Sequence, residues 1–309
     1  MDITTSSHTQ LTTGTRARKR RFSWLPYLLI LPTLIFVVVF TLWPSLATVY
    51  NSLFRANQAV RVPQFIGLGN YLNLIQDPVF LQVLRNTALF VVTTVPLSMG
   101  LGLALALLLN QKLRAIGIFR LAIFYPTILP LVSAATIWLF MYTPDYGVVA
   151  TFLRPFGIRG QNWLGNPDLA LWAIIVMTIW KQTGYYMIFY LAGIQNLPQD
   201  VFEAVALDGA TLWQEIRYIT FPLLSATTLF VTTIAVVAAF QMVDQVYIMT
   251  QGGPDNASNL LMYHIYETQF RFQDRGEANA MTVLLVLILL MFTISNFLWF
   301  EGRTTYESD

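Results

Sequence analysis

The amino-acid sequence predicts an all-α membrane protein with six transmembrane helices. Its 309 residues are 56% hydrophobic and only 11% charged, whereas ordinary soluble domains are about 25% charged. The apolar residues also gather into six runs, each long enough to cross the bilayer core, which takes about 20 helical residues. A chain of this composition cannot present a normal water-facing surface, so we expect it to lie in a lipid bilayer.

The first predicted span covers residues 24–53 and follows a basic segment, residues 1–22, which we expect to be disordered and cytoplasmic. The basic residues nearest to this span are Arg16, Arg18, Lys19, Arg20 and Arg21. A signal peptide has the same pattern, but its apolar core is about 7–15 residues long. The uncharged run from Ser23 to Ala47 is longer, so we interpret it as an uncleaved helix.

Five further spans follow along the chain. They are predicted at 84–110, 116–143, 169–194, 219–249 and 279–300. Prolines inside or at the start of several spans remove backbone hydrogen-bond donors. We therefore expect bends in these spans, at which neighbouring helices satisfy the carbonyls that lose their donors. Lys and Arg are more frequent on the side of the N-terminus, which predicts that both termini are cytoplasmic and that residues 301–309 form a cytoplasmic tail.

The outer loops are predicted at 54–83, 144–168 and 250–278. The stretch FIGLGNYLNLIQDPVFLQVL in the first loop has the spacing of a helix lying in the membrane interface. Thr250 to Asn259 is rich in turn residues.

In the second span, small residues at Gly100, Gly102, Ala104 and Ala106 allow close helix approach, and we favour packing within the chain over a dimer motif.

A polar insert separates the fourth and fifth spans on the cytoplasmic side. Pro198 and Asp200 suit the start of a short helix, and Asp208-Gly209 suits its left-handed end. A second, amphipathic helix then leads to Pro222. Surface-lying helices are usually basic, and this elbow is net acidic, so docking of a protein is the favoured interpretation.

Residues of the elbow resemble a sequence motif of a known protein family. Glu203-Ala204, Asp208-Gly209-Ala210 and Pro222 resemble the cytoplasmic EAA loop of permease subunits in binding-protein-dependent ABC importers. GLGNY, GIQNLPQDVFEA and MTQGGP are similar to the carbohydrate-importer branch that includes the larger maltose permease subunit. SWLPYLLILPTL and WKQTGYY are similar to the first glycerol-3-phosphate permease subunit. Val205 departs from the usual alanine of the motif.

The resemblance implies a type I ABC importer permease fold over residues 23–300, with a coupling loop at 197–222 that docks on a cytoplasmic ATPase. The implied coupling residues are Glu203, Ala204, Asp208, Gly209, Ala210 and Pro222. The implied partners are a second, non-identical permease subunit, an ATPase dimer and an extracytoplasmic solute-binding protein, in a bacterial inner membrane. ATP and Mg²⁺ would be bound by the ATPase, because none of the three lysines of this chain lies in a glycine-rich phosphate loop.

The fourth span carries the polar residues expected of a transport pathway. Lys181 lies about ten residues from either end, roughly 15 Å at 1.5 Å per residue, which is long for a snorkelling lysine. We favour a cavity-facing Lys181 over an ion pair with Asp244. By resemblance, Ala235, Ala238 and Ala239 replace polar contacts of the maltose protein, which argues against maltose itself. The candidate pathway residues are Thr178, Trp180, Lys181, Gln182, Tyr185, Ala239, Gln241, Met242 and Asp244.

Other functions are disfavoured. The chain has no cysteine and only two histidines, so we expect no metal site and no catalytic triad, and its net charge of +2 does not suggest a nucleic-acid partner. We expect a transport subunit without its own cofactor or enzyme activity, which takes up a sugar, an oligosaccharide or sn-glycerol-3-phosphate. Lys181 favours the phosphate ester weakly. A subunit of an ion-coupled secondary transporter is the alternative, because broken helices and a buried Lys and Asp also suit ion coupling.

Overall fold

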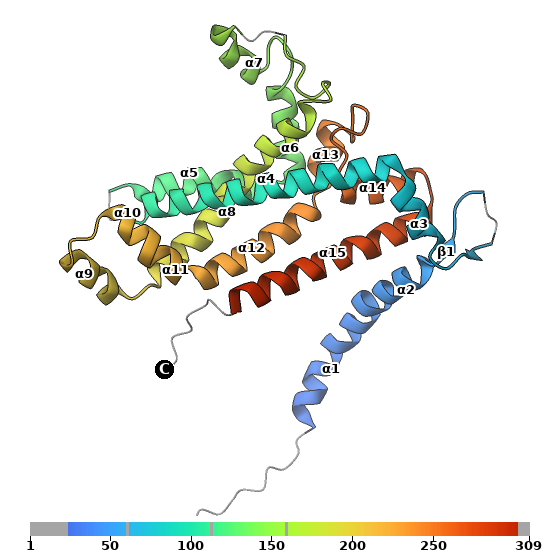
Figure 1. Cartoon of the computed structure of the whole chain (residues 1–309), viewed down its shortest axis with the longest axis horizontal. Coiled ribbons are helices and arrows are strands. Elements are labelled where there is room, and N and C mark those ends of the chain that lie inside the picture. The colour runs from blue at the N-terminus through green and yellow to red at the C-terminus, as the bar shows by residue number, and fades with distance from the viewer. Residues whose placement is uncertain (1–23, 60–61, 112–113, 158–159, 302–309) are drawn as a thin grey trace, which may run out of the picture. The chain divides into compact units, whose positions relative to one another are not determined.

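The computed structural model describes residues 24–59, 62–111, 114–157 and 160–301, and these are mostly helical (Figure 1). The predicted basic N-terminal segment and the predicted C-terminal tail beyond residue 301 lie outside the described residues. The chain divides into two units, residues 1–47 and 48–309, and each is considered by itself.

The first unit contains most of the first predicted span. Its helical stretch consists of α1 (Leu25–Val37), a π-helical turn η1 (Val38–Leu42) and α2 (Trp43–Asn51), whose last residues belong to the second unit. Pro32 lies inside α1, where it removes one backbone donor. Residues 27–51 are long and apolar enough to cross a membrane, in agreement with the predicted span.

The second unit holds the remaining elements. Its first half consists of β1 (Phe54–Arg55), β2 (Gln64–Phe65), α3 (Gly69–Gln76), α4 (Pro78–Leu109), α5 (Ile116–Ile128), α6 (Leu131–Met141), α7 (Val148–Leu153), η2 (Arg154–Phe156) and α8 (Ala170–Gln195). Its second half consists of α9 (Gln199–Leu207), α10 (Leu212–Glu215), η3 (Ile216–Thr220), α11 (Phe221–Leu223), α12 (Ser225–Phe240), α13 (Asp244–Met249), α14 (Leu261–Tyr266), η4 (Glu267–Arg271) and α15 (Arg275–Glu301). The two short strands pair antiparallel, with Phe54 opposite Phe65.

The packing of the second unit centres on α4 and α8. These two helices make the most extensive contact, α5 packs on α8, and α12 lies against α4 and α15. Close approach of α4 and α8 depends on Gly102, because a Cβ there would lie 3.0 Å from the backbone nitrogen of Met187. Ala106 is fully buried on the same helix. The expected packing of small residues within the chain is therefore confirmed at Gly102, whereas Gly100 faces open space.

Four stretches of the described residues are long and apolar enough to cross a membrane, and the α5–α6 pair adds a fifth if it counts as one span. The predicted third span is divided, because α5 and α6 meet at an angle of 97° around Pro130, so the expected proline bend is confirmed there. Helix α8 has 26 residues but is less apolar, because Lys181 and Gln182 lie in its middle. The count of six spans stays a prediction.

The second span begins earlier than predicted. Asp77 accepts hydrogen bonds from the backbone nitrogens of Val79 and Phe80 and so caps α4, with Pro78 in its first turn. The segment DPVFLQVL, which we assigned to an interface helix, therefore belongs largely to α4, and only α3 forms a separate helix. The missed signal is the Asp-Pro pair, a typical helix start.

Candidate functional site

The elbow, residues 197–222, begins with α9. Gly209 follows this helix with a φ of +72°, a left-handed conformation that a residue without Cβ adopts without strain. The backbone nitrogen of Gly209 donates to the Ala206 carbonyl at 3.2 Å, and that of Ala210 donates to the Val205 carbonyl at 3.3 Å. These two bonds form a Schellman motif, so the predicted left-handed stop is confirmed.

The second arm of the elbow starts immediately after this stop. Thr211 and Gln214 form a capping box, in which each side chain bonds the backbone nitrogen of the other residue. Helix α10 continues through η3 into α11, which contains Pro222. Gly209 and Ala210 thus join two capped helices, and the backbone N–H groups of residues 208–211 are all hydrogen-bonded locally.

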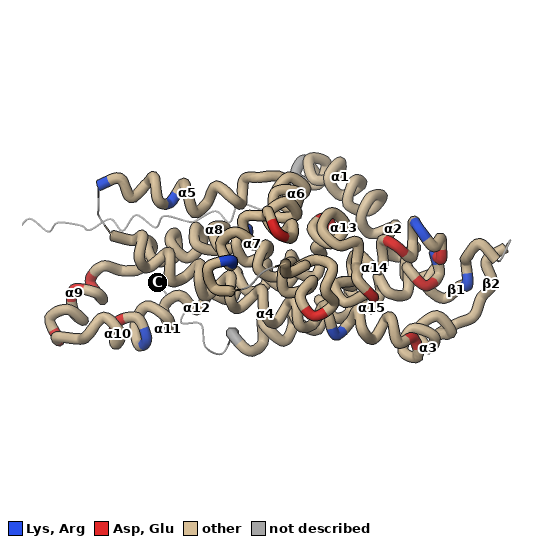
Figure 2. The backbone as a smooth tube through the Cα atoms, turned by 90° about the horizontal axis from the view of Figure 1, so that it is seen from above, with Lys and Arg blue, Asp and Glu red and all other residues tan. Residues whose placement is uncertain are grey.

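The elbow presents an acidic and partly apolar surface. Leu207, Leu212 and Trp213 are 89%, 70% and 71% exposed, so large apolar side chains of the elbow are available for contact with another molecule. The acidic residues of α9 and α10 lie at one end of the second unit, and α3 lies at the other end (Figures 1 and 2). The exposed coupling candidates are Glu203, Ala204, Asp208, Gly209, Ala210 and Pro222.

A cavity of about 850 Å³ lies behind the elbow, between it and the ends of α4 and α8. Arg120 lines this cavity together with Glu203 and Glu215. The Nη2 atom of Arg120 donates to the Leu109 carbonyl at 2.7 Å, so a cation satisfies the carbonyl end of α4. This bond connects the end of α4 to α5, in which Arg120 lies.

Lys181 lies in the middle of α8 and is 9% exposed. Its Nζ atom donates to the carbonyls of Leu129 at 2.6 Å, Pro126 at 3.0 Å and Thr127 at 3.4 Å. Asp244, the alternative partner expected from the sequence, forms no ion pair within the described part of the chain, where a single salt bridge joins Arg271 and Glu267. The amine is therefore directed at the break between α5 and α6.

The other candidates on α8 occupy different environments. Thr178 is buried and donates to the carbonyl of Ile174 in its own helix. Trp180 is 37% exposed and meets Trp138 edge to face, with 5.6 Å between ring centroids. Tyr185 is half-buried against Phe189, at 4.9 Å between ring centroids. Gln182 is also half-buried.

The candidates of the predicted fifth span, residues 219–249, lie at a second helix break, between α12 and α13. Ala239 and Met242 are buried, whereas Gln241 and Asp244 are exposed between the end of α12 and the start of α13. Gln245, which the sequence reasoning missed, is fully buried, and both atoms of its amide lack a hydrogen-bond partner. Buried unpaired amides are rare. The neighbouring polar residues Gln241 and Asp244 are the signal that could have directed attention to it.

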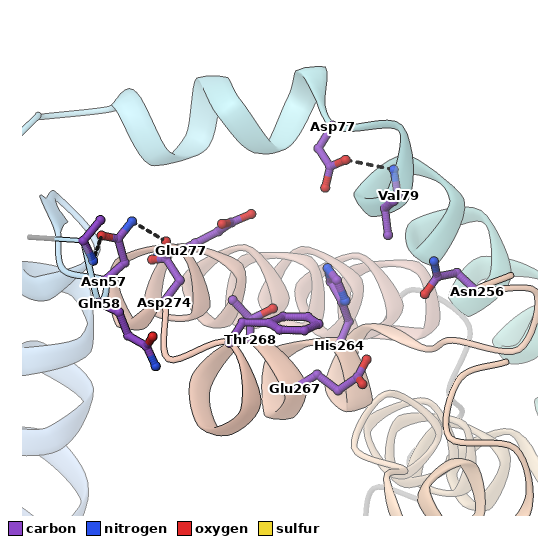
Figure 3. Close-up of a pocket in the computed structure, with 12 residues that line it drawn as sticks. Asn57, Gln58, Asp77, Val79, Asn256, His264, Glu267, Thr268, Asp274 and Glu277 are labelled. Atoms are coloured by element: carbon purple, nitrogen blue, oxygen red, sulfur yellow. Dashed lines mark hydrogen bonds between the residues drawn. The ribbon is translucent and has the colours of Figure 1, made fainter.

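A polar pocket of about 560 Å³ opens at the end of the second unit opposite the elbow, in the region of the predicted outer loops (Figure 3). Asn57 donates to Asp274 at 3.0 Å across this pocket. Burial lowers the pKa of His264, and the carboxylates of Glu267 and Asp77 oppose that shift. The described residues contain no group of three or more His, Asp or Glu side chains placed to bind a metal. Most residues that line the pocket are polar, and its carboxylates are those of Asp77, Glu267, Asp274 and Glu277.

Comparison with known proteins gives consistent matches over most of the chain. Residues 98–301 match the family model described as binding-protein-dependent transport system inner membrane component. The lactose transport system permease protein LacF of Rhizobium radiobacter is 36% identical over 297 residues, covering 94% of this chain and 98% of that protein. The sn-glycerol-3-phosphate transport system permease protein UgpA of Agrobacterium fabrum is 34% identical over 284 residues, covering 91% and 96%.

The fold also matches a solved structure. A bacterial ABC transporter involved in the import of the acidic polysaccharide alginate aligns with a TM-score of 0.79 at 22% sequence identity, covering 91% of this chain and 96% of that chain. At this level of identity the match concerns the fold. The matched family region includes α8, the elbow and α12, which carry the candidate residues.

Proposed function

Because this chain belongs to the family of binding-protein-dependent transport system inner membrane components, we propose that it is the permease subunit of an ATP-driven importer for a carbohydrate. The observation that carries the proposal is the elbow, a rigid pair of capped helices with an acidic and apolar exposed surface. The chain is a transport subunit and not an enzyme. ATP and Mg²⁺ are bound by the separate ATPase.

The elbow transmits motion in this proposal. Its first helix docks in a groove of the ATPase, with Glu203 and Asp208 facing basic groups and with Leu207 and Trp213 filling apolar depressions. Because the backbone N–H groups of residues 208–211 are all hydrogen-bonded within the elbow, a displacement of α9 moves α10 and the connected α12 as one body. ATPase closure around ATP then drives the pathway from inward-facing to outward-facing, a domain movement of the hinge type.

The transported molecule passes between α8 and α12, which contact each other. Gln182, Gln241 and Asp244 supply polar groups, Trp180 and Tyr185 supply rings that can pack against a sugar, and Thr178, Ala239 and Met242 shape the wall. The similarity to lactose and glycerol-3-phosphate permeases supports a sugar, an oligosaccharide or sn-glycerol-3-phosphate as the substrate.

The partners follow from the same proposal. The chain pairs with a second, non-identical permease subunit in the bacterial inner membrane, with six spans and with both termini in the cytoplasm. The elbow end then faces the ATPase dimer. The opposite end, with the polar pocket around Asp274 and Asn57, faces the extracytoplasmic solute-binding protein.

The proposal is tested by measuring ATP hydrolysis of the reconstituted complex with its binding protein. We expect one sugar or glycerol-3-phosphate, out of a panel, to stimulate hydrolysis and to accumulate inside the vesicles. If no ATPase co-purifies with this chain and uptake follows an imposed ion gradient, the secondary-transporter alternative is correct.

The docking role of the elbow makes a separate prediction for Glu203→Lys. Reversing this exposed charge places like charges across the docking surface, which costs several kcal/mol, so we expect uptake to fall roughly 10-fold or more while membrane insertion is unchanged. Arg154→Glu, a charge reversal outside the elbow, serves as the control. Normal co-purification with the ATPase and normal uptake by Glu203→Lys would contradict the docking role.

A further inference from the structure

The break between α5 and α6 leaves backbone carbonyls without helical donors. In an uninterrupted helix the Pro126 carbonyl would accept from the backbone nitrogen of residue 130, but Pro130 has no N–H. The carbonyls of Thr127 and Leu129 lose their partners because the chain turns by 97° at this point. Unsatisfied carbonyls are costly where no water reaches them.

Lys181 supplies the missing donors from another helix. An ammonium group has three N–H donors, and Nζ lies within 3.4 Å of these three carbonyl oxygens. The connection is reciprocal, because the hydroxyl of Thr127 donates to the Lys181 carbonyl at 3.0 Å. Gly184, one turn further along α8, packs directly against Ile123 and Phe124 of α5. Two successive turns of α8 thus hold the break and the turn of α5 that precedes it.

We infer that Lys181 is a positioning residue that fixes the bend between α5 and α6, and that it is not a ligand of the transported molecule. All of its donors are directed to the backbone carbonyls, so none remains for a phosphate or carboxylate. This inference rests on the proposed function only in its consequence for the substrate, which is that Lys181 offers it no positive charge and that the polar contacts come from Gln182, Gln241 and Asp244. An uncharged sugar fits such a site better than glycerol-3-phosphate.

The first test measures the bend itself. Because the chain has no cysteine, Phe119→Cys on α5 and Phe140→Cys on α6 introduce two unique spin-label sites, both 61% exposed. In Lys181→Met we expect the distance distribution between the labels to shift or broaden. Val176→Met, an exposed position on the same helix, is the control and should retain the original distribution. An unchanged distribution in Lys181→Met would overturn the inference.

The second test separates positioning from binding in the full transporter with its ATPase and binding protein. We expect Lys181→Met to lower the maximal uptake rate roughly 10-fold, while the half-saturating concentration of a neutral sugar changes by no more than about twofold. A rise of roughly 10-fold or more in the half-saturating concentration of glycerol-3-phosphate, with the maximal rate and the label distances unchanged, would show a ligand and overturn the inference.

A third variant tests whether Lys181 positions the bend if Lys181→Met does not accumulate in the membrane. Lys181→Gln keeps two N–H donors and removes the charge, so it should accumulate and keep the original label distances. If Lys181→Gln also fails to accumulate in the membrane, the positive charge of residue 181 is required and its hydrogen bonds are not sufficient. The inference would then be wrong. A wild-type complex that transports no carbohydrate would contradict the proposed function, whereas the label distances would still decide the role of Lys181.

Discussion

Gly184→Ala is expected to prevent normal folding of the membrane domain. A Cβ at this position would overlap the Ile123 carbonyl oxygen and would lie 3.0 Å from the Ile123 carbonyl carbon and the Phe124 Cα. These are backbone atoms, which cannot move aside by a change of rotamer. Overpacking in a dense core typically costs about 1–3 kcal/mol, and we expect about 3 kcal/mol or more here because two helix backbones must separate.

The measurement is the amount of protein that remains monodisperse after extraction from the membrane, together with its thermal unfolding midpoint. Gly100→Ala is the matched control, because Gly100 also lies within a membrane helix but a Cβ there would have no neighbouring atom within 4 Å. We expect the control to be neutral or more stable by about 0.5–1 kcal/mol, since alanine is the better helix former. Equal stability of the two variants would contradict the close contact of α5 and α8.

Gly209→Pro is expected to abolish coupled transport while the membrane helices still fold. Proline cannot adopt the φ of +72° found at this position, and it removes the hydrogen bond from Gly209 to the Ala206 carbonyl. The Schellman motif is therefore lost and the angle between α9 and α10 changes. We expect uptake and substrate-stimulated ATP hydrolysis to fall roughly 10-fold or more, because the displaced α9 no longer fits the groove of the ATPase.

The control for this variant is Gly157→Pro, a glycine with a φ of +82° at the end of η2, outside the elbow. Both variants force a backbone with a positive φ to rearrange and remove one backbone hydrogen bond. Uptake by Gly157→Pro should be close to that of the wild type. A stimulated ATPase activity of Gly209→Pro that equals the wild-type value would show that the geometry of the elbow does not matter for coupling.

Much of the fold follows from local sequence patterns. The apolar runs predict the long helices, because a bilayer core requires a minimum number of consecutive apolar residues. Asp208-Gly209 predicts the end of α9, because glycine adopts the left-handed conformation without strain, and the structure confirms it. The family resemblance carried by Glu203, Ala204 and Gly209 is borne out by the match of residues 98–301 to the family model.

Features that depend on contacts distant in the sequence were not predicted. The sequence identifies Lys181 as an unusual intramembrane charge, but its partners, Pro126, Thr127 and Leu129, lie more than 50 residues away. The start of α4 at Pro78 could have been recognised from its Asp-Pro signal, whereas the need for glycine at 184 has no local signal at all.

The sequence by itself thus determined the membrane class, the approximate positions of the helices and the chemistry of the elbow, because hydrophobicity, capping and backbone preference act over a few neighbouring residues. Only the tertiary structure decided the size of the bend between α5 and α6, which is 97°, the attachment of that bend to Lys181 and the tight fit at Gly184. These features depend on which helices pack against one another. Local sequence patterns do not predict the packing of residues that lie far apart in the chain.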